Sequence, residues 1–160
     1  MKITVKNLGA IRQAQFELGD MTIICGGNNT GKTYATYALF GFLTFWRETL
    51  KVPVAEEVVD LLLKDGSIEL DVDDYIANAQ KFVDDGCRAY TRNLSRVFAS
   101  SEKYFSESEF LIDISDKDIQ PVTTYDRTIA TAKASLFKIS KKEGESELLI
   151  SAMCKLRLEV

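Results

Sequence analysis

Hydrophobic and polar positions alternate near the start of the chain in a way that predicts short strands. Apolar residues occupy every second position over residues 2–6, which predicts a strand with one buried face. The same alternation over residues 11–18 predicts a half-buried antiparallel strand. Residues 21–25 (MTIIC) are almost wholly apolar, which predicts a strand buried on both faces. The next apolar stretch, residues 34–46, predicts a buried helix.

The middle of the chain carries a helical pattern, and we expect a helical insertion over residues 51–105. Residues 55–66 predict one helix that stops at its terminal glycine. A longer helix is predicted to begin at a cap formed by Asp73 or Asp74 and to run to about residue 98.

The last third, residues 106–160, changes to strand patterns and predicts antiparallel strands. A turn around Gly144 is expected to join two of them as a hairpin. The predicted strands are 109–114, 133–140, 147–152 and 155–160. With residues 1–50 supplying strands, a loop and the first helix, 160 residues predict one domain with a mixed α/β fold.

Composition removes several classes of function. The chain has 20 basic and 24 acidic residues, a net charge of −4, so no overall field attracts it to nucleic acid. It has no histidine, which excludes a Ser-His-Asp or Cys-His catalytic centre and any histidine-ligated zinc site within the chain.

The cysteines and the apolar stretches indicate a cytoplasmic location. Cys25, Cys87 and Cys154 are too far apart for a metal ribbon or a disulfide framework, and three reduced thiols are typical of the cytosol. No export signal is visible at the N-terminus. The longest apolar stretch is shorter than the roughly 20 residues that cross a bilayer, so we expect no membrane partner.

One motif carries chemistry. Residues 26–33 (GGNNTGKT) fit G-x-x-x-x-G-K-[ST], the phosphate-binding P-loop, and stand between the predicted strand 21–25 and the apolar helix. Glycines 26 and 31 allow the backbone angles that turn the loop's N–H groups inward to an anion. We expect Lys32 to reach the β- and γ-phosphates and the Thr33 hydroxyl to ligate Mg²⁺.

The alternative is a glycine-rich turn that caps a buried helix, which leaves the lysine before an apolar helix without an anion. We therefore favour nucleotide binding, with Lys32 as the catalytic residue and Thr33 as the metal ligand. The predicted cofactor-binding residues are Gly26, Gly27, Asn28, Asn29, Thr30, Gly31, Lys32, Thr33 and Tyr34.

The loop and the residues before it resemble a known superfamily. GGNNTGKT, with asparagine in third place, is similar to the G-x-N-x-[ST]-G-K-[ST] loop of ABC-type ATPase heads in the SMC, RecF and overcoming-lysogenization-defect (OLD) proteins. The segments ITVKNLGAI, QAQFEL and MTIIC resemble the strands that lead into that loop, so the likeness covers residues 1–50. It implies a P-loop core with an antiparallel subdomain.

The resemblance also implies a function. It implies that ATP and Mg²⁺ bind, and that ATP is hydrolysed only when two heads enclose the nucleotide, in a homodimer or with a second ATPase lobe. By the same comparison Asn28 lies near the γ-phosphate and Asn7 near the base. Relatives act in DNA repair, chromosome organisation and phage defence, so DNA is an expected partner of the full-length protein or of an associated one.

Other parts of such a head are missing from the sequence. The best candidate for the Walker B strand is residues 110–113, but Ile114 stands where the water-activating glutamate belongs. The alternative is an antiparallel strand with Asp113 in solvent. No L-S-G-G signature is present, and Gln120 is a weak candidate for the Q-loop.

Two explanations remain open. We favour an incomplete head, the N-terminal lobe of a longer ATPase, that is weak or inactive alone. The alternative is a small non-catalytic nucleotide-binding module that controls association with a partner. A P-loop GTPase is disfavoured because no N-K-x-D motif is present.

Two surface patterns have alternative explanations. Arg88, Arg92 and Arg96 form a stripe that either contacts phosphates or, as we favour, is a solvated helix face. The predicted first helix carries aromatic residues that indicate core packing, or a partner interface where they stay exposed: Tyr37, Phe40, Phe42, Phe45 and Trp46.

Overall fold

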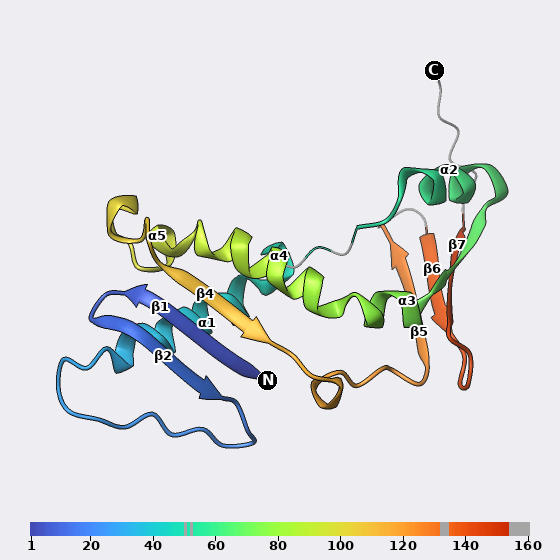
Figure 1. The fold of residues 1–160 in the computed structure, drawn as a ribbon. Helices are drawn as coiled ribbons and strands as arrows, with labels where there is room; N and C mark the ends of the chain where they lie inside the picture. Colours follow the sequence, from blue (N-terminus) through green and yellow to red (C-terminus); the bar gives the residue numbers. More distant parts are fainter. Residues whose placement is uncertain (50, 52, 132–134, 154–160) are drawn as a thin grey trace. The chain divides into compact units, whose positions relative to one another are not determined.

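The computed structural model describes residues 1–49, 51, 53–131 and 135–153 (Figure 1). The chain forms two compact units, each built from two segments of the sequence. Unit 1 comprises Met1–Val52 and Ala79–Ile119, and unit 2 comprises Pro53–Asn78 and Gln120–Val160. The loop of residues 26–33 belongs to unit 1.

Unit 1 contains a three-stranded sheet in the order β2-β1-β4, antiparallel throughout (Figure 1). Its strands are β1 (Lys2–Leu8), β2 (Ile11–Glu17) and β4 (Glu109–Asp113). In the central strand Ile3 pairs with Phe16 on one side and with Ile112 on the other. Ile3 and Val5 are fully buried, so the alternation in the sequence correctly predicted both the strand and its buried face.

Helices cover the buried face of this sheet. They are α1 (Lys32–Thr49), α4 (Ala79–Thr91) and the short α5 (Leu94–Val97), followed by a 3₁₀ turn, η1 (Glu102–Tyr104). The buried Tyr90 of α4 donates a hydrogen bond of 2.7 Å to the carbonyl oxygen of Ala38 in α1. The Phe42 and Phe110 rings stack between α1 and β4, with centroids 5.3 Å apart. This core holds α1 firmly along its middle.

The prediction of a buried strand over residues 21–25 is wrong. The segment is irregular, and the side chains of Met21 and Ile23 are 82% and 76% exposed. A strand buried on both faces needs a hydrogen-bonded neighbour and cover on each face, and this segment has no strand partner among the described residues. All strand pairs in the described part of the chain are antiparallel. The observed class is therefore a mixture of helices and antiparallel sheets, which agrees with the predicted mixed α/β fold in its coarse form.

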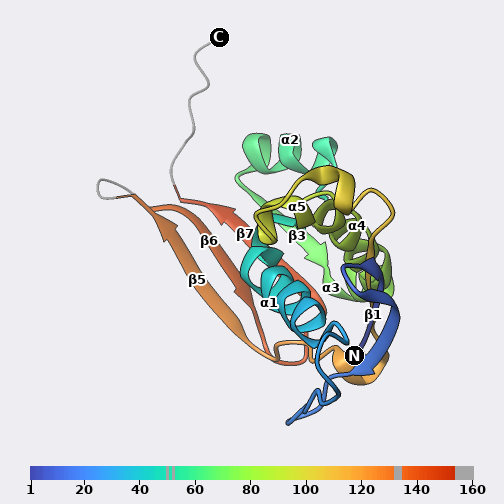
Figure 2. The same ribbon diagram turned by 90° about the vertical axis from the view of Figure 1, so that its left-hand side faces the viewer.

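Unit 2 contains a four-stranded antiparallel sheet in the order β3-β7-β6-β5, and Figure 2 shows β5, β6 and β7 side by side. Its elements are α2 (Glu56–Asp65), β3 (Ser67–Asp71), α3 (Val72–Ala77), β5 (Tyr125–Ala130), β6 (Ser135–Lys141) and β7 (Glu147–Ala152). Gly66 ends α2 in the left-handed conformation, and its N–H donates to Leu62. Gly144, with φ +80°, lies in the β6–β7 turn, as predicted.

Two elements predicted within the helical insertion of residues 51–105 differ in the structure. Residues 67–71 form β3, because this segment pairs with β7, which is distant in the sequence. The long helix predicted from Asp73 or Asp74 is divided into α3, α4 and α5, and its N-cap is Asp71, which accepts a hydrogen bond of 2.9 Å from the Asp73 N–H. The predicted strand 155–160 lies outside the described residues.

The contact at Gly41 yields a stability prediction. A Cβ on Gly41 of α1 would overlap the Tyr90 hydroxyl and lie 2.7 Å from Val97 Cγ1. Gly41→Ala would gain about 1 kcal/mol of helix propensity in an exposed helix, but overpacking costs about 1–3 kcal/mol and should dominate here. We expect a lower free energy of unfolding in urea. Gly19→Ala, whose nearest neighbour is 3.9 Å away, should change it little. A Gly41→Ala protein as stable as the parent would contradict this packing.

Candidate nucleotide-binding site

The loop of residues 26–31 takes up backbone angles that require small residues. Gly26 has φ +153° and Gly31 has φ +85°, and Asn29 between them has φ +60°. Glycine adopts such angles without steric cost, and asparagine is among the few other residues that tolerate them. The Gly31 carbonyl accepts a 3.1 Å hydrogen bond from the Ala35 N–H, so α1 begins directly after the loop. The predicted need for glycine at 26 and 31 is confirmed.

Gly31 also fixes the loop to the sheet. A Cβ at this position would overlap Ile11 Cγ1 at the start of β2 and lie 3.2 Å from its Cδ1. Gly31 is buried by this contact, whereas residues 26–30 are exposed. The loop is therefore held at its end and open to solvent along the rest of its length.

The Lys32 side chain turns back over the loop. Its ammonium donates a 2.7 Å hydrogen bond to the Gly26 carbonyl oxygen and a second, very short one to that of Gly27. The Thr30 hydroxyl donates to the Gly27 carbonyl oxygen at 2.9 Å and lies 3.5 Å from the ammonium. The loop thus curls around one positive charge, which faces the loop rather than the bulk solvent.

The first turn of α1 adds further groups that can bind an anion. The amides of Lys32, Thr33 and Tyr34 precede the first N–H that bonds within the helix, and they carry the positive end of its dipole. Such a helix start, combined with a lysine, can hold phosphate oxygens. The exposed Thr33 hydroxyl is the type of oxygen ligand that Mg²⁺ accepts beside phosphates. Among the described residues, no group of three or more cysteine, aspartate or glutamate side chains is arranged so that it could hold a metal ion by itself.

The candidate Walker B carboxylate, Asp113, and the candidate Q-loop residue, Gln120, are not placed at this loop. Asp113 is exposed at the end of the antiparallel strand β4, opposite Lys2. The loop contacts Ile11, which pairs with Leu8 at the other end of β1. The interpretation of residues 110–113 as an antiparallel strand with Asp113 in solvent is confirmed. Gln120 is exposed and belongs to unit 2.

The arginine stripe and the thiols contribute nothing to the loop. Arg88, Arg92 and Arg96 are all exposed, and Arg88 forms an ion pair with Asp85. Cys25 is a free, exposed thiol next to Gly26. Cys87 is free and buried, and burial raises the pKa of its thiol to about 12, so this thiol stays protonated at neutral pH.

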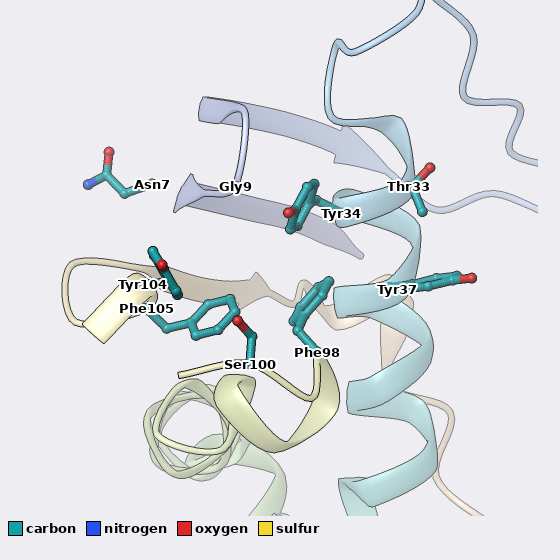
Figure 3. Close-up of a pocket in the computed structure, with 9 residues that line it drawn as sticks. All are labelled: Asn7, Gly9, Thr33, Tyr34, Tyr37, Phe98, Ser100, Tyr104 and Phe105. Atoms are coloured by element: carbon teal, nitrogen blue, oxygen red, sulfur yellow. The ribbon is translucent and has the colours of Figure 1, made fainter. Parts of the chain in front are cut away.

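A cavity of about 600 Å³ lies beside the first turn of α1 (Figure 3). The sequence analysis named Asn7, Thr33 and Tyr34 as candidate site residues but did not predict that residues 98–105 join them. The lining of the cavity comes from the β1–β2 turn, from α1 and from the segment before β4: Asn7, Gly9, Thr33, Tyr34, Tyr37, Phe98, Ser100, Tyr104 and Phe105. The one sequence signal for residues 98–105 was the aromatic group at 98, 104 and 105. A second hollow of about 670 Å³ lies between residues 23–26 and β2, and Lys32 lines it.

Among the described residues no helix is long and apolar enough to cross a membrane. Residues 1–150 match a family model described as "AAA ATPase domain". Neither the curated proteins nor the solved structures contain a significant match.

The contact between Gly31 and Ile11 predicts an effect of adding one methyl group to the loop. In Gly31→Ala the new Cβ would overlap the Ile11 side chain, and alanine would also be strained at the positive φ of this position. The loop should therefore detach from β2. We expect amide hydrogen exchange in residues 30–36 to accelerate about tenfold or more. Gly27→Ala is the matched control, because its Cβ would meet only Thr30 Cγ2 at 3.8 Å. Equal exchange in the two variants would show that the contact does not hold the loop.

Proposed function

Because the chain belongs to the AAA ATPase domain family, we propose that residues 26–33 bind the triphosphate of ATP together with Mg²⁺. The observation that carries this proposal is the position of Lys32. Its ammonium donates to the carbonyl oxygens of Gly26 and Gly27, in the loop that leads directly into the first turn of α1, where the amides of residues 32–34 precede the first helical hydrogen bond. A positive charge and several N–H donors then converge on one anion-sized region.

Each residue has a role in this proposal. The Lys32 ammonium contacts the β- and γ-phosphates as a point charge, and the amides of the loop and of the first helical turn bind the remaining phosphate oxygens. Thr33 ligates Mg²⁺, which neutralises charge on the same phosphates. Asn28 is exposed in the same loop, and its proposed role is to approach the γ-phosphate.

For hydrolysis we propose that a second lobe or a second copy of the chain supplies the water-activating carboxylate. Asp113 lies at the end of β4 away from the loop. A group that activates water has to stand within hydrogen-bond reach of it, directly or through one further water molecule. This chain then holds the nucleotide, and catalysis depends on assembly. Roles in DNA repair or phage defence, and contact with DNA, stay predictions from the resemblance.

Binding can be tested by the thermal shift with ATP and Mg²⁺. A ligand at about 100 times its Kd stabilises the folded state by about 2.7 kcal/mol, so the melting temperature should rise measurably. Lys32→Ala should abolish the rise. Lys64→Ala removes a lysine charge from the exposed surface of α2, in unit 2, and should leave the rise intact.

The metal ligand can be tested in the same assay. Thr33→Ala should remove most of the Mg²⁺-dependent part of the shift, while Thr33→Ser retains the hydroxyl and should restore it. Proposed binding at this loop would be wrong if Lys32→Ala and the parent protein responded equally.

Turnover separates binding from catalysis. The purified chain should release phosphate from ATP far below the 1–10³ s⁻¹ that is typical of enzymes, because the candidate carboxylate, Asp113, lies at the end of β4 away from the loop. Steady-state phosphate release by the chain alone measures this. A rate of about 1 s⁻¹ or more that Lys32→Ala abolishes would show that the chain carries its own water-activating group.

A further inference from the structure

The sheet of unit 2 has one apolar face that the unit itself does not bury. In an antiparallel sheet, residues that lie directly opposite one another on neighbouring strands are on the same face. Ile68 of β3 lies opposite Ile150 of β7, and Ile150 lies opposite Ile139 of β6. No described residue of unit 2 is buried, whereas unit 1 has a buried core. Unit 2 therefore carries an apolar sheet face without complete cover.

The opposite face of this sheet is polar and faces water. The Lys138 ammonium of β6 forms an ion pair of 2.9 Å with the Asp126 carboxylate of β5. Along β3, the apolar Ile68 and Leu70 are half-buried, while the polar residues that alternate with them are exposed. Such alternation is typical of a sheet with one face on a core and the other in solvent. The apolar face is thus the one that needs a partner.

One helix covers about half of the apolar face. α2 packs against β3 and β7, and its only residues that are not exposed are Val58 and Leu62, which lie one turn apart. A helix is about 10 Å in diameter and neighbouring strands are about 4.8 Å apart, so one helix covers about two strands. The sheet has four strands, in the order β3-β7-β6-β5 (Figure 2). The width over β6 and β5 therefore accommodates a second helix beside α2.

The apolar residues over β5 and β6 are accessible, and we call them the β5–β6 strip: Tyr125, Ile129, Phe137 and Ile139. Ile129 of β5 lies opposite Phe137 of β6 and is 43% exposed. Tyr125, on the same face of β5, is 37% exposed. β5 is also an edge strand of the sheet. A partner can therefore reach the strip from the β5 side and remove apolar area from water.

The charge on the strip indicates the chemistry of the partner. Arg127 lies opposite Ile139, in the middle of the strip, and it is exposed and forms no ion pair with another described residue. Lys141, opposite Tyr125, adds a second positive charge to this face. A partner that covers an unpaired guanidinium has to supply a carboxylate to it. α2 has this composition itself, because its sequence EEVVDLLLKD combines apolar residues with acidic ones.

We propose that the β5–β6 strip is a docking surface for an acidic amphipathic helix of a partner protein. The helix lies beside α2 and completes the cover of the sheet. Its apolar side chains contact Ile129 and Phe137, and its flanking carboxylates pair with Arg127. The inference is independent of nucleotide binding, because the strip belongs to unit 2 and residues 26–33 belong to unit 1.

The test measures fluorescence anisotropy of a labelled synthetic peptide added to the full chain without nucleotide. The probe is a helical peptide with leucine along one face and glutamate on both flanks. Its control peptide has lysine in place of every glutamate. We expect the acidic peptide to bind with a Kd of about 100 μM or tighter, and the lysine peptide to bind about tenfold more weakly or worse.

Variants of β5 locate the binding surface. Ile129→Ser should weaken the acidic peptide about tenfold, because an apolar contact is lost. Arg127→Glu should reverse the preference between the two peptides. Thr128→Glu is the matched control, because it introduces the same charge on the same strand but on the polar face, and it should leave the preference unchanged. The melting temperature of each variant shows whether it is folded.

Three results would overturn the proposal. The first is no binding of the acidic peptide at about 1 mM. The second is equal binding of the acidic and the lysine peptides, or an equal effect of Arg127→Glu and Thr128→Glu. The third comes from sedimentation equilibrium of the chain without peptide: a dimer that Ile129→Ser dissociates would assign the strip to a second copy of the chain. An oligomeric state that Ile129→Ser leaves unchanged is the expected result.

Discussion

At two glycines the backbone packs so closely against a neighbouring side chain that no Cβ would fit. These two contacts fix the start of α1 to the β1–β2 hairpin, and the candidate site depends on them. Gly31, at the end of the loop, lies against Ile11 of β2. Gly9, in the hairpin turn, lies against the ring of Tyr34 on α1. The contacts are reciprocal, because each partner supplies one glycine and one large side chain. Together they set where the helix begins, and therefore where its free amides and Lys32 are held.

The remainder of unit 1 makes that position rigid. Tyr90 donates a hydrogen bond to Ala38 in the middle of α1, and Gly41 one turn later allows α4 and α5 to approach closely. Close-packed contacts of this kind resist displacement, because any shift of the helix loses many small attractive interactions at once. A loop that is open to solvent is thus attached to a helix that cannot easily move. Such preorganisation reduces the ordering that a nucleotide would have to impose on binding.

Local patterns in the sequence correctly predicted those elements whose structure depends mainly on neighbouring residues. The alternation around Ile3 and the turns at Gly66 and Gly144 were read correctly, because each depends on a few neighbouring residues. The fit of residues 26–33 to a phosphate-binding loop was visible for the same reason. The segment 21–25 failed because burial of a strand depends on neighbours that its own residues do not encode. The aromatic cavity was predicted only in part, because it joins the turn at Asn7 to Tyr104, almost one hundred positions away.

The order of pairing in unit 1 has a consequence for how the protein is made. β1 pairs with β4, so Lys2 lies opposite Asp113. A ribosome synthesises the β1–β2 hairpin and α1 long before β4 emerges. Until then one edge of β1 and the apolar side of α1 have no cover, and such exposed surfaces favour aggregation. Closing so long a loop is also intrinsically slow. The first segment of unit 1 is therefore open to wrong pairing until β4 has been synthesised and has closed the sheet.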